Sequence, residues 1–260
     1  VGVRYRGGQR QVVVDGVEGK LEDLALMVCV VSLAPELDRV FYEAPGGRRA
    51  LLDAWTAQVV KGHDEAVSRY GVHTKNRLKI LLQGGAADWL EAEEFQAARW
   101  GVVMLEGRAK YMALVQGHMD GLRVRLNGTA QEVLAADDPV AMLKGKLERS
   151  REIDVRLERT SAGPNTLDVV AELEMGEAWV VAKQSSSGQH KRVLLRWLCA
   201  HVRALQGLGV APLVVVDELG AHLDAAGKAE AVEALAGLGV QVWVSDVAMD
   251  DHPLVRVVRV

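Results

Sequence analysis

Two adjacent carboxylates at the end of a short apolar run are the residues of this chain best suited to chemistry. Asp217 and Glu218 follow Leu213–Val216, a wholly apolar stretch that comes directly after Pro212. Such a run is typical of a buried parallel strand, and open α/β sheets hold ligands at the carboxyl ends of their strands. Nucleotide hydrolysis needs one carboxylate that binds a metal and one that faces water. An acidic pair at the start of a helix is the simpler alternative.

A serine-rich turn precedes the apolar run and has its own chemical meaning. Ser185–Gly188 leads into a sequence whose apolar residues repeat with helical spacing, which predicts that a helix begins there. Free backbone N–H groups and the helix dipole make such a start an anion site, although a serine in this place is also an ordinary N-cap. The apolar stripe of this helix is Leu194, Trp197, Leu198, Val202 and Leu205.

Three segments in order resemble the C-terminal half of an ABC-type ATPase head, and specifically the RecF family of recombination-repair proteins, which are relatives of the SMC proteins. Ser186–Gln189 is similar to the signature motif, Val214–Glu218 to the Walker B strand and Ala221–Asp224 to the D-loop. Any one of these motifs alone would be weak, whereas the three in order and at matching spacing are specific. The resemblance implies an α/β fold with an α-helical lid domain inserted into the ATPase head.

The resemblance also implies a role for each motif residue. Asp217 would help to hold the Mg²⁺ that bridges the phosphates of ATP, and Glu218 would orient or deprotonate the attacking water. The signature start would reach ATP held by the phosphate loop (P-loop) of a second head, so that ATP is sandwiched in an ATP-dependent homodimer with the D-loop at its interface. The residues that would face nucleotide or dimer interface are Ser186, Ser187, Gly188, Gln189 and Asp224.

A phosphate loop of the form G-x-x-x-x-G-K-[ST] is absent from the sequence. The pairs Gly19–Lys20 and Gly145–Lys146 lack both the leading glycine and the following hydroxyl, and the chain begins with Val1. We therefore expect this sequence to lack an N-terminal strand, P-loop and helix. ATP and Mg²⁺ binding would need that missing segment.

The resemblance implies a protein of recombinational repair and replication restart. It would bind DNA at single-strand gaps and single-/double-strand junctions, and would help recombination mediator proteins to load recombinase in the cytoplasm. The alternative is a non-catalytic scaffold that binds DNA or a partner. A phosphate loop encoded just upstream would favour the ATPase, and a stop codon there would favour the scaffold.

Composition is ordinary for a soluble globular protein of one large or two moderate domains. The 260 residues carry a net charge of −4 and are 49% hydrophobic, so any nucleic-acid contact must come from a local patch. The longest apolar run is too short to cross a bilayer, and Cys29 and Cys199 fit buried thiols in a reducing cytosol. We expect head strands in residues 1–35, the helical lid in residues 36–150 and the rest of the head in residues 151–260.

The lid is predicted to contain two packed helices. Leu52, Trp55, Val59 and Ala66 are expected on one stripe of the first helix. A second, heptad-like seam would pack against it as an antiparallel hairpin, weakened by Gly101 and Gly107. The seam residues are Phe95, Ala98, Val102, Leu105, Ala109 and Met112.

Strands and helices of the head follow from similar local patterns. A hairpin signal at Asp15–Gly16 joins early strands, and Ser245 stands where an ABC transporter has its switch histidine. The predicted strands are Val3–Arg6, Gln11–Val14, Met27–Val31, Asp154–Arg159, Leu167–Leu173, Trp179–Ala182 and Val240–Val244, and the predicted helices are Lys144–Arg151 and Ala225–Leu238.

A run of basic residues in the lid is the candidate DNA contact. Between Arg69 and Lys79 there are four basic residues and no acidic ones. Such a run is usually a solvated face, and the alternative is a ridge that contacts DNA phosphates. The RecF resemblance favours the ridge, whose residues are Arg69, Lys75, Arg77 and Lys79.

Overall fold

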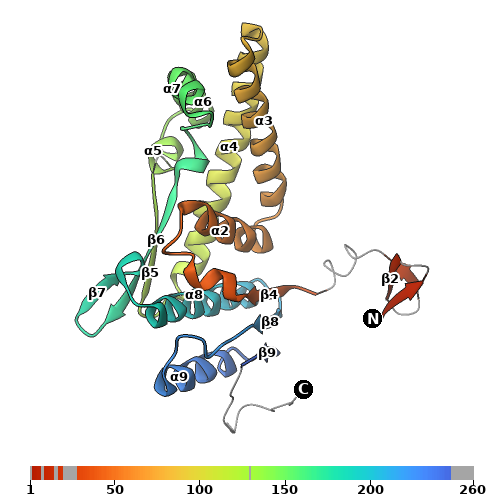
Figure 1. Cartoon of the computed structure of the whole chain (residues 1–260), viewed down its shortest axis with the longest axis vertical. Helices are drawn as coiled ribbons and strands as arrows, with labels where there is room; N and C mark the ends of the chain where they lie inside the picture. The colour runs from red at the N-terminus through yellow and green to blue at the C-terminus, as the bar shows by residue number, and fades with distance from the viewer. Residues whose placement is uncertain (1, 7–8, 15–16, 20–27, 129, 247–260) are drawn as a thin grey trace.

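The computed structural model describes residues 2–6, 9–14, 17–19, 28–128 and 130–246 (Figure 1). A long pair of helices rises from a base that contains a parallel sheet and its helices. The candidate site lies in this base.

The N-terminal residues form an antiparallel sheet of their own. Strands β1 (Gly2–Arg6), β2 (Gln9–Val14) and β3 (Val17–Gly19) pair in the order β1-β2-β3. This confirms the two strands predicted there. The hairpin signal at Asp15–Gly16 lies outside the described residues, and the strands on either side of it pair in antiparallel fashion.

A three-stranded parallel sheet carries the predicted Walker B strand in its centre. Strand β8 (Leu213–Val216) pairs with β4 (Val30–Leu33) on one side and with β9 (Val242–Val244) on the other. Val31 and Val214 are fully buried on one face of this sheet. The prediction that the apolar run after Pro212 is a buried parallel strand is confirmed.

Two helices flank this strand in the chain. Helix α8 (Ser187–Gly207) precedes β8, and α9 (Ala225–Ala236) follows it. All five residues of the predicted apolar stripe of α8 are buried. The buried Lys191 of α8 donates to Asp38 of the short 3₁₀ helix η1 (Pro35–Arg39) at 2.9 Å, which ties α8 to the exit of β4.

A helical hairpin dominates the upper part of the molecule (Figure 1). Helix α2 (Pro45–Val59) leads into α3 (His63–Gln83), which packs along α4 (Ala87–Gln116). The predicted single stripe from Leu52 to Ala66 is therefore wrong. The chain leaves α2 after Val59, so Ala66 belongs to α3.

The seam predicted for α4 is correct at its centre, fails at Phe95 and Ala109, and packs against the core again at Met112, its last residue. Ala98, Val102 and Leu105 are buried, whereas Phe95 is 47% exposed and Ala109 is exposed. Gly101, expected to weaken the seam, lies where three helices meet: a Cβ atom there would lie 2.7 Å from Leu143 of α6 and 3.1 Å from Tyr70 of α3. The missing side chain allows this close approach.

Three short helices follow the hairpin: α5 (Ala130–Leu134), α6 (Pro139–Arg149) and α7 (Arg151–Leu157). Helix α6 confirms a predicted helix, whereas the strand predicted at Asp154–Arg159 is wrong because its first residues belong to α7. The apolar residues that suggested alternation, Val155 and Leu157, are substantially exposed.

A second sheet joins segments on both sides of residue 150. Strand β6 (Asp168–Met175) pairs in antiparallel fashion with β7 (Ala178–Val181), as predicted, and with β5 (Leu122–Asn127), which was not predicted. Thus β5, in the range assigned to the lid, shares a sheet with strands assigned to the head. The three-domain division stays a prediction. Two further 3₁₀ helices are η2 (Pro164–Thr166) and η3 (Ala182–Gln184).

Candidate nucleotide half-site at the edge of the parallel sheet

The two candidate carboxylates lie exposed at the carboxyl edge of β8. The backbone N–H of Asp217 donates to the Leu33 carbonyl at 2.9 Å, which extends the pairing of β8 with β4 by one residue. Asp217 and Glu218 then leave the sheet and are exposed. Asp217 lines a hollow of about 380 Å³, together with Ser32, Ala34 and Ser245. This is the edge at which parallel sheets hold ligands.

Ser245 ties the end of β9 to both carboxylate residues. Its backbone N–H donates to the Val216 carbonyl at 3.0 Å, and its hydroxyl donates to Asp217 Oδ1. The same hydroxyl oxygen accepts a hydrogen bond from the backbone N–H of Glu218 at 3.0 Å. Ser245 therefore orients the predicted metal ligand, a contact that sequence reasoning did not foresee.

The loop after β8 holds two residues in an uncommon backbone conformation. Glu218 has φ = 51° and His222 has φ = 67°. A non-glycine residue in this left-handed region costs of the order of 1–3 kcal/mol and persists only where its surroundings enforce it. Strain of this kind at the predicted water-facing carboxylate supports a functional interpretation of the loop.

The start of α8 is a capping box. Ser186 is the N-cap, its hydroxyl accepts from the Gln189 N–H at 3.4 Å, and the Gln189 side chain accepts from the Ser186 N–H at 2.8 Å. The N-cap interpretation of the serines is therefore confirmed. It does not exclude the phosphate role, because Ser186 and Ser187 are exposed and a hydroxyl that accepts one bond can still donate another.

Gly188 brings the start of α8 against the predicted D-loop. A Cβ atom at this position would lie 2.7 Å from the carbonyl oxygen of His222, a separation that real side chains do not tolerate. The absent side chain and the left-handed backbone of His222 together set this contact. The predicted signature start and D-loop therefore pack directly on each other within one chain.

Asp224 connects the D-loop to two helices. Its carboxylate caps α9 by accepting from the Gly227 N–H at 2.8 Å, as an N-cap aspartate does. Arg192 of α8 lies 3.7 Å from the same carboxylate oxygen. The Asp224 side chain is 76% exposed, so it remains accessible to a second molecule.

Gly188→Ala is expected to lower the free energy of unfolding by about 1–3 kcal/mol, the usual cost of overpacking, and to increase hydrogen exchange in residues 219–224. Urea unfolding and amide exchange measure the two effects. Gly207→Ala is the matched control: it lies at the end of the same helix, and nothing lies within 4 Å of the added Cβ. Gly207→Ala should be neutral or slightly stabilising. Equal effects of the two substitutions would disprove the contact.

Three of the four residues predicted to form a basic ridge lie on the surface of α3, and the fourth is buried. Arg69, Lys75 and Lys79 are exposed, whereas Arg77 is fully buried and cannot contact DNA. Its guanidinium donates to Glu94 at 3.0 Å and to Asp154 at 2.6 Å. The prediction for Arg77 is corrected for this reason.

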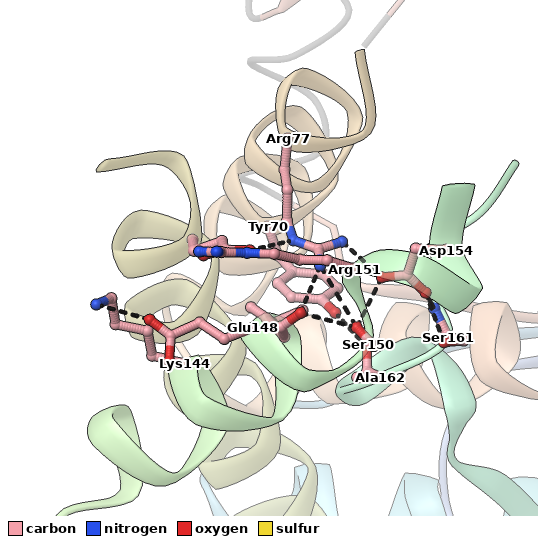
Figure 2. A network of polar contacts seen from close by, with 11 residues as sticks. Tyr70, Arg77, Lys144, Glu148, Ser150, Arg151, Asp154, Ser161 and Ala162 are labelled. Atoms are coloured by element: carbon pink, nitrogen blue, oxygen red, sulfur yellow. Dashed lines mark hydrogen bonds and ion pairs between the residues drawn. The ribbon is translucent and has the colours of Figure 1, made fainter. Parts of the chain in front are cut away.

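A buried network around Arg77 joins α3, α4 and α7 (Figure 2). Arg151 also donates to Glu94, and Asp154 accepts from Ser150 at 2.7 Å and from Ser161. Burial would raise the pKa of Asp154, but the hydrogen bonds from Ser161, Ser150 and Arg77 outweigh it and hold that pKa below its usual value. The network anchors the hairpin to α7.

Asp217 and Ser245 supply part of a Mg²⁺ donor set rather than a complete metal site. Within the described residues, no three His, Cys, Asp or Glu side chains are grouped as a preformed metal site. Mg²⁺ in nucleotide sites is typically held by one or two protein oxygens together with phosphates and water, and Asp217 with Ser245 fits that donor set. No helix in the described part of the chain is long and apolar enough to span a membrane.

Comparison with known proteins gives a consistent result. The DNA replication and repair protein RecF of Brucella suis biovar 1 is 27% identical over 252 residues, which are 92% of this chain and 65% of that protein. RecF of Rickettsia rickettsii is 26% identical over 234 residues, 86% of this chain and 64% of that protein. The chain thus spans slightly less than two thirds of these curated relatives. No protein-family model matches it.

The fold comparison covers almost the whole chain. A solved structure of the recombination mediator protein RecF with ATP superposes with a TM-score of 0.72 at 20% identity, over 94% of this chain and 69% of that one. A second, described as RecF-ATPrS in the RecFOR pathway, gives the same score at 19% identity over 98% and 71%. The α/β fold expected from the sequence is confirmed.

Proposed function

We propose that this RecF-like chain supplies the signature, Walker B and D-loop half of a composite ATP site. The proposal rests on the contacts that bring the three segments together. Gly188 lies against His222, Arg192 lies beside Asp224, and Ser245 links the Walker B carboxylate to the sheet edge. A head that must present the signature start and D-loop together to a second head needs this arrangement.

In this proposal each exposed group has a defined task. Asp217, oriented by Ser245, holds Mg²⁺, which neutralises charge on the phosphates when it is bound. Glu218 orients or deprotonates the attacking water. Ser186, with the free N–H groups at the start of α8, contacts the γ-phosphate of ATP on the partner head. Asp224 lies at the homodimer interface.

The biological role proposed here is DNA repair and replication at single-strand gaps and junctions, in the cytoplasm and with recombination mediator proteins that load recombinase. Its support is the similarity to curated proteins described as DNA replication and repair proteins. A non-catalytic scaffold that binds DNA or a partner remains the second candidate, because the sequence contains no phosphate loop.

Titration of the 260-residue chain with Mg·ATP tests the half-site proposal. No binding is expected in the calorimeter, because the chain contributes carboxylates but no phosphate loop. A version that carries a phosphate loop ahead of Val1 should bind ATP at micromolar concentration. Micromolar affinity of the 260-residue chain itself would refute the proposal. Failure of the extended version to bind would favour the scaffold.

The revised DNA ridge consists of Arg69, Lys75 and Lys79. Replacing Lys75 and Lys79 by Gln should reduce the slope of log K against log salt for duplex binding by about 1.8, because each phosphate contact contributes about 0.9. Fluorescence anisotropy over a salt series measures the slope. Arg125→Gln, an exposed basic residue of β5, is the control and should leave it unchanged. An unchanged slope in the double variant would make the ridge a solvated surface.

A further inference from the structure

A half-open cavity of about 390 Å³ lies between α8 and α9, and its end at Arg192 and Gly227 adjoins Asp224. Its third side is formed by the turn between α4 and β5 and by the end of β6. A cavity of this size is within the range that binds small molecules or anchoring side chains. The lining residues used below are Arg192, Leu195, Cys199, Arg203, Glu230 and Ala231.

The floor of the cavity is apolar because α9 presents small residues to α8. Gly227, Ala231 and Ala234 repeat at intervals of four and three along one face of α9 and line the cavity. On the α8 side the floor is formed by Leu195 and Cys199, both buried. Larger side chains on α9 would close the space, so the small residues leave room for an apolar group from outside.

An arginine lies at each end of the cavity rim, and the nearest carboxylates are too far from either guanidinium for a hydrogen bond. Arg192 lies 3.7 Å from both Asp224 and Glu230, and Arg203 lies 3.8 Å from Asp120. These separations exceed the 2.7–3.2 Å of an N–H···O hydrogen bond. Neither guanidinium makes a hydrogen bond to the part of the chain that the structure describes. A molecule that brings carboxylate oxygens to both ends would satisfy them.

The spacing and the remaining rim groups favour a peptide over a simple anion. Arg192 and Arg203 are eleven residues apart on one helix, or about 16 Å at 1.5 Å per residue, too far for one carboxylate. Between them the rim carries Glu174, Glu230 and Arg196, whose guanidinium donates to Glu230 at 3.1 Å and to the Gly121 carbonyl at 3.0 Å. Glu174 and the remaining lone pairs of Glu230 can accept hydrogen bonds from the N–H groups of an extended backbone, which a simple anion lacks.

We propose that this cavity is a docking site for a segment of a partner protein in which one apolar side chain is flanked by two acidic residues. The apolar side chain lies on Leu195, Cys199 and Ala231. The flanking carboxylates pair with Arg192 and Arg203. The site shares Arg192 with the proposed ATP half-site, so its test uses no nucleotide, and its two variants change only Arg203 and Ala231, which lie outside the half-site.

The test uses a defined peptide, acetyl-Glu-Ala-Phe-Ala-Glu-amide, and Cys199 as the reporter in a Cys29→Ser background. Burial raises the pKa of the Cys199 thiol to about 11, so a small thiol reagent such as methyl methanethiosulfonate reacts slowly and its rate is easily followed. The peptide should slow the reaction at least tenfold at millimolar concentration. The Lys-Ala-Phe-Ala-Lys analogue and the Glu-Ala-Ala-Ala-Glu analogue should have little effect.

Two variants test the two halves of the site. Arg203→Gln removes one end charge from a side chain that is 39% exposed, so the fold should not change, and peptide affinity in fluorescence anisotropy should fall at least threefold. Ala231→Phe fills the floor and should abolish binding, with an unchanged circular dichroism spectrum as evidence of folding. Absence of protection, equal protection by the lysine analogue, or unchanged affinity in both variants would overturn the proposal. Equal protection by a simple dicarboxylate such as azelate would exclude a peptide as the occupant.

Discussion

Arg77→Met is expected to lower the free energy of unfolding by about 3–5 kcal/mol, because it removes the central cation of a buried network and leaves the buried Asp154 without a cation, while Glu94 keeps only Arg151. Glu94 and Asp154 are both fully buried and both accept from Arg77. Methionine keeps much of the side-chain volume, so the loss reports charge rather than packing. Urea unfolding followed by circular dichroism measures the effect.

Lys79→Met on the same helix is the control for Arg77→Met. Lys79 is exposed, and its replacement should change stability by no more than about 0.5 kcal/mol. A cost below about 1 kcal/mol for Arg77→Met would mean that the network contributes little to stability.

The loss of stability caused by Arg77→Met should also become smaller as the pH falls. The native pKa of Asp154 is lowered, so its stabilising contribution is complete above the unfolded value of about 3.9 and is lost as the pH falls through the native value. The difference between wild type and Arg77→Met should therefore shrink in acid. A constant difference from pH 6 to pH 2 would contradict the assignment.

Glu218→Gln is expected to reduce ATP turnover by about 10²- to 10⁴-fold in a version of the protein that carries a phosphate loop ahead of Val1. Glutamine keeps the size and hydrogen bonding of the side chain but removes the charge that activates water. Mg·ATP should still bind, since Asp217 and Ser245 are unchanged. A phosphate-release assay and calorimetry separate the two effects.

Glu233→Gln provides the control for Glu218→Gln. This residue is exposed on α9, and the substitution should leave turnover unchanged. If Glu218→Gln retains more than a tenth of wild-type turnover, the water-activating role belongs to another group.

The elements that carry the site could be predicted because their signals are local. Pro212 and the apolar run after it define β8, and Ser186 with Gln189 three residues later is the sequence form of a capping box. The Ser245 contacts could not be derived in this way, because they require the registration of β9 beside β8, which depends on residues far apart in the chain.

The predicted strand at Asp154–Arg159 failed because a long-range contact outweighed local alternation. Asp154 bonds to Arg77, 77 residues earlier, and to Ser150 one turn before it in the chain. Both bonds fit a helix. The alternation of Val155 and Leu157 therefore had no buried face to match.

The burial of Arg77 and the strand β5 were both missed, although the sequence contains a signal for each. Lys75 and Lys79 are four residues apart and share a helix face, whereas Arg77 projects from the opposite face with Tyr70 and Thr74, both buried. Strand β5 alternates apolar and arginine residues over residues 122–126. Assigning the whole of residues 36–150 to a helical lid obscured that pattern.

ATP-dependent association most directly tests the claim that the start of α8 faces a nucleotide on a second head. The phosphate-loop version is compared by light scattering with Mg·ATP as Glu218→Gln and as Glu218→Gln with Ser186→Arg, which adds bulk and charge at the N-cap. The account predicts a doubled mass for the single variant and an unchanged mass for the double variant, with ATP bound by both. Dimers of both variants, or ATP binding without a dimer in the single variant, would contradict it.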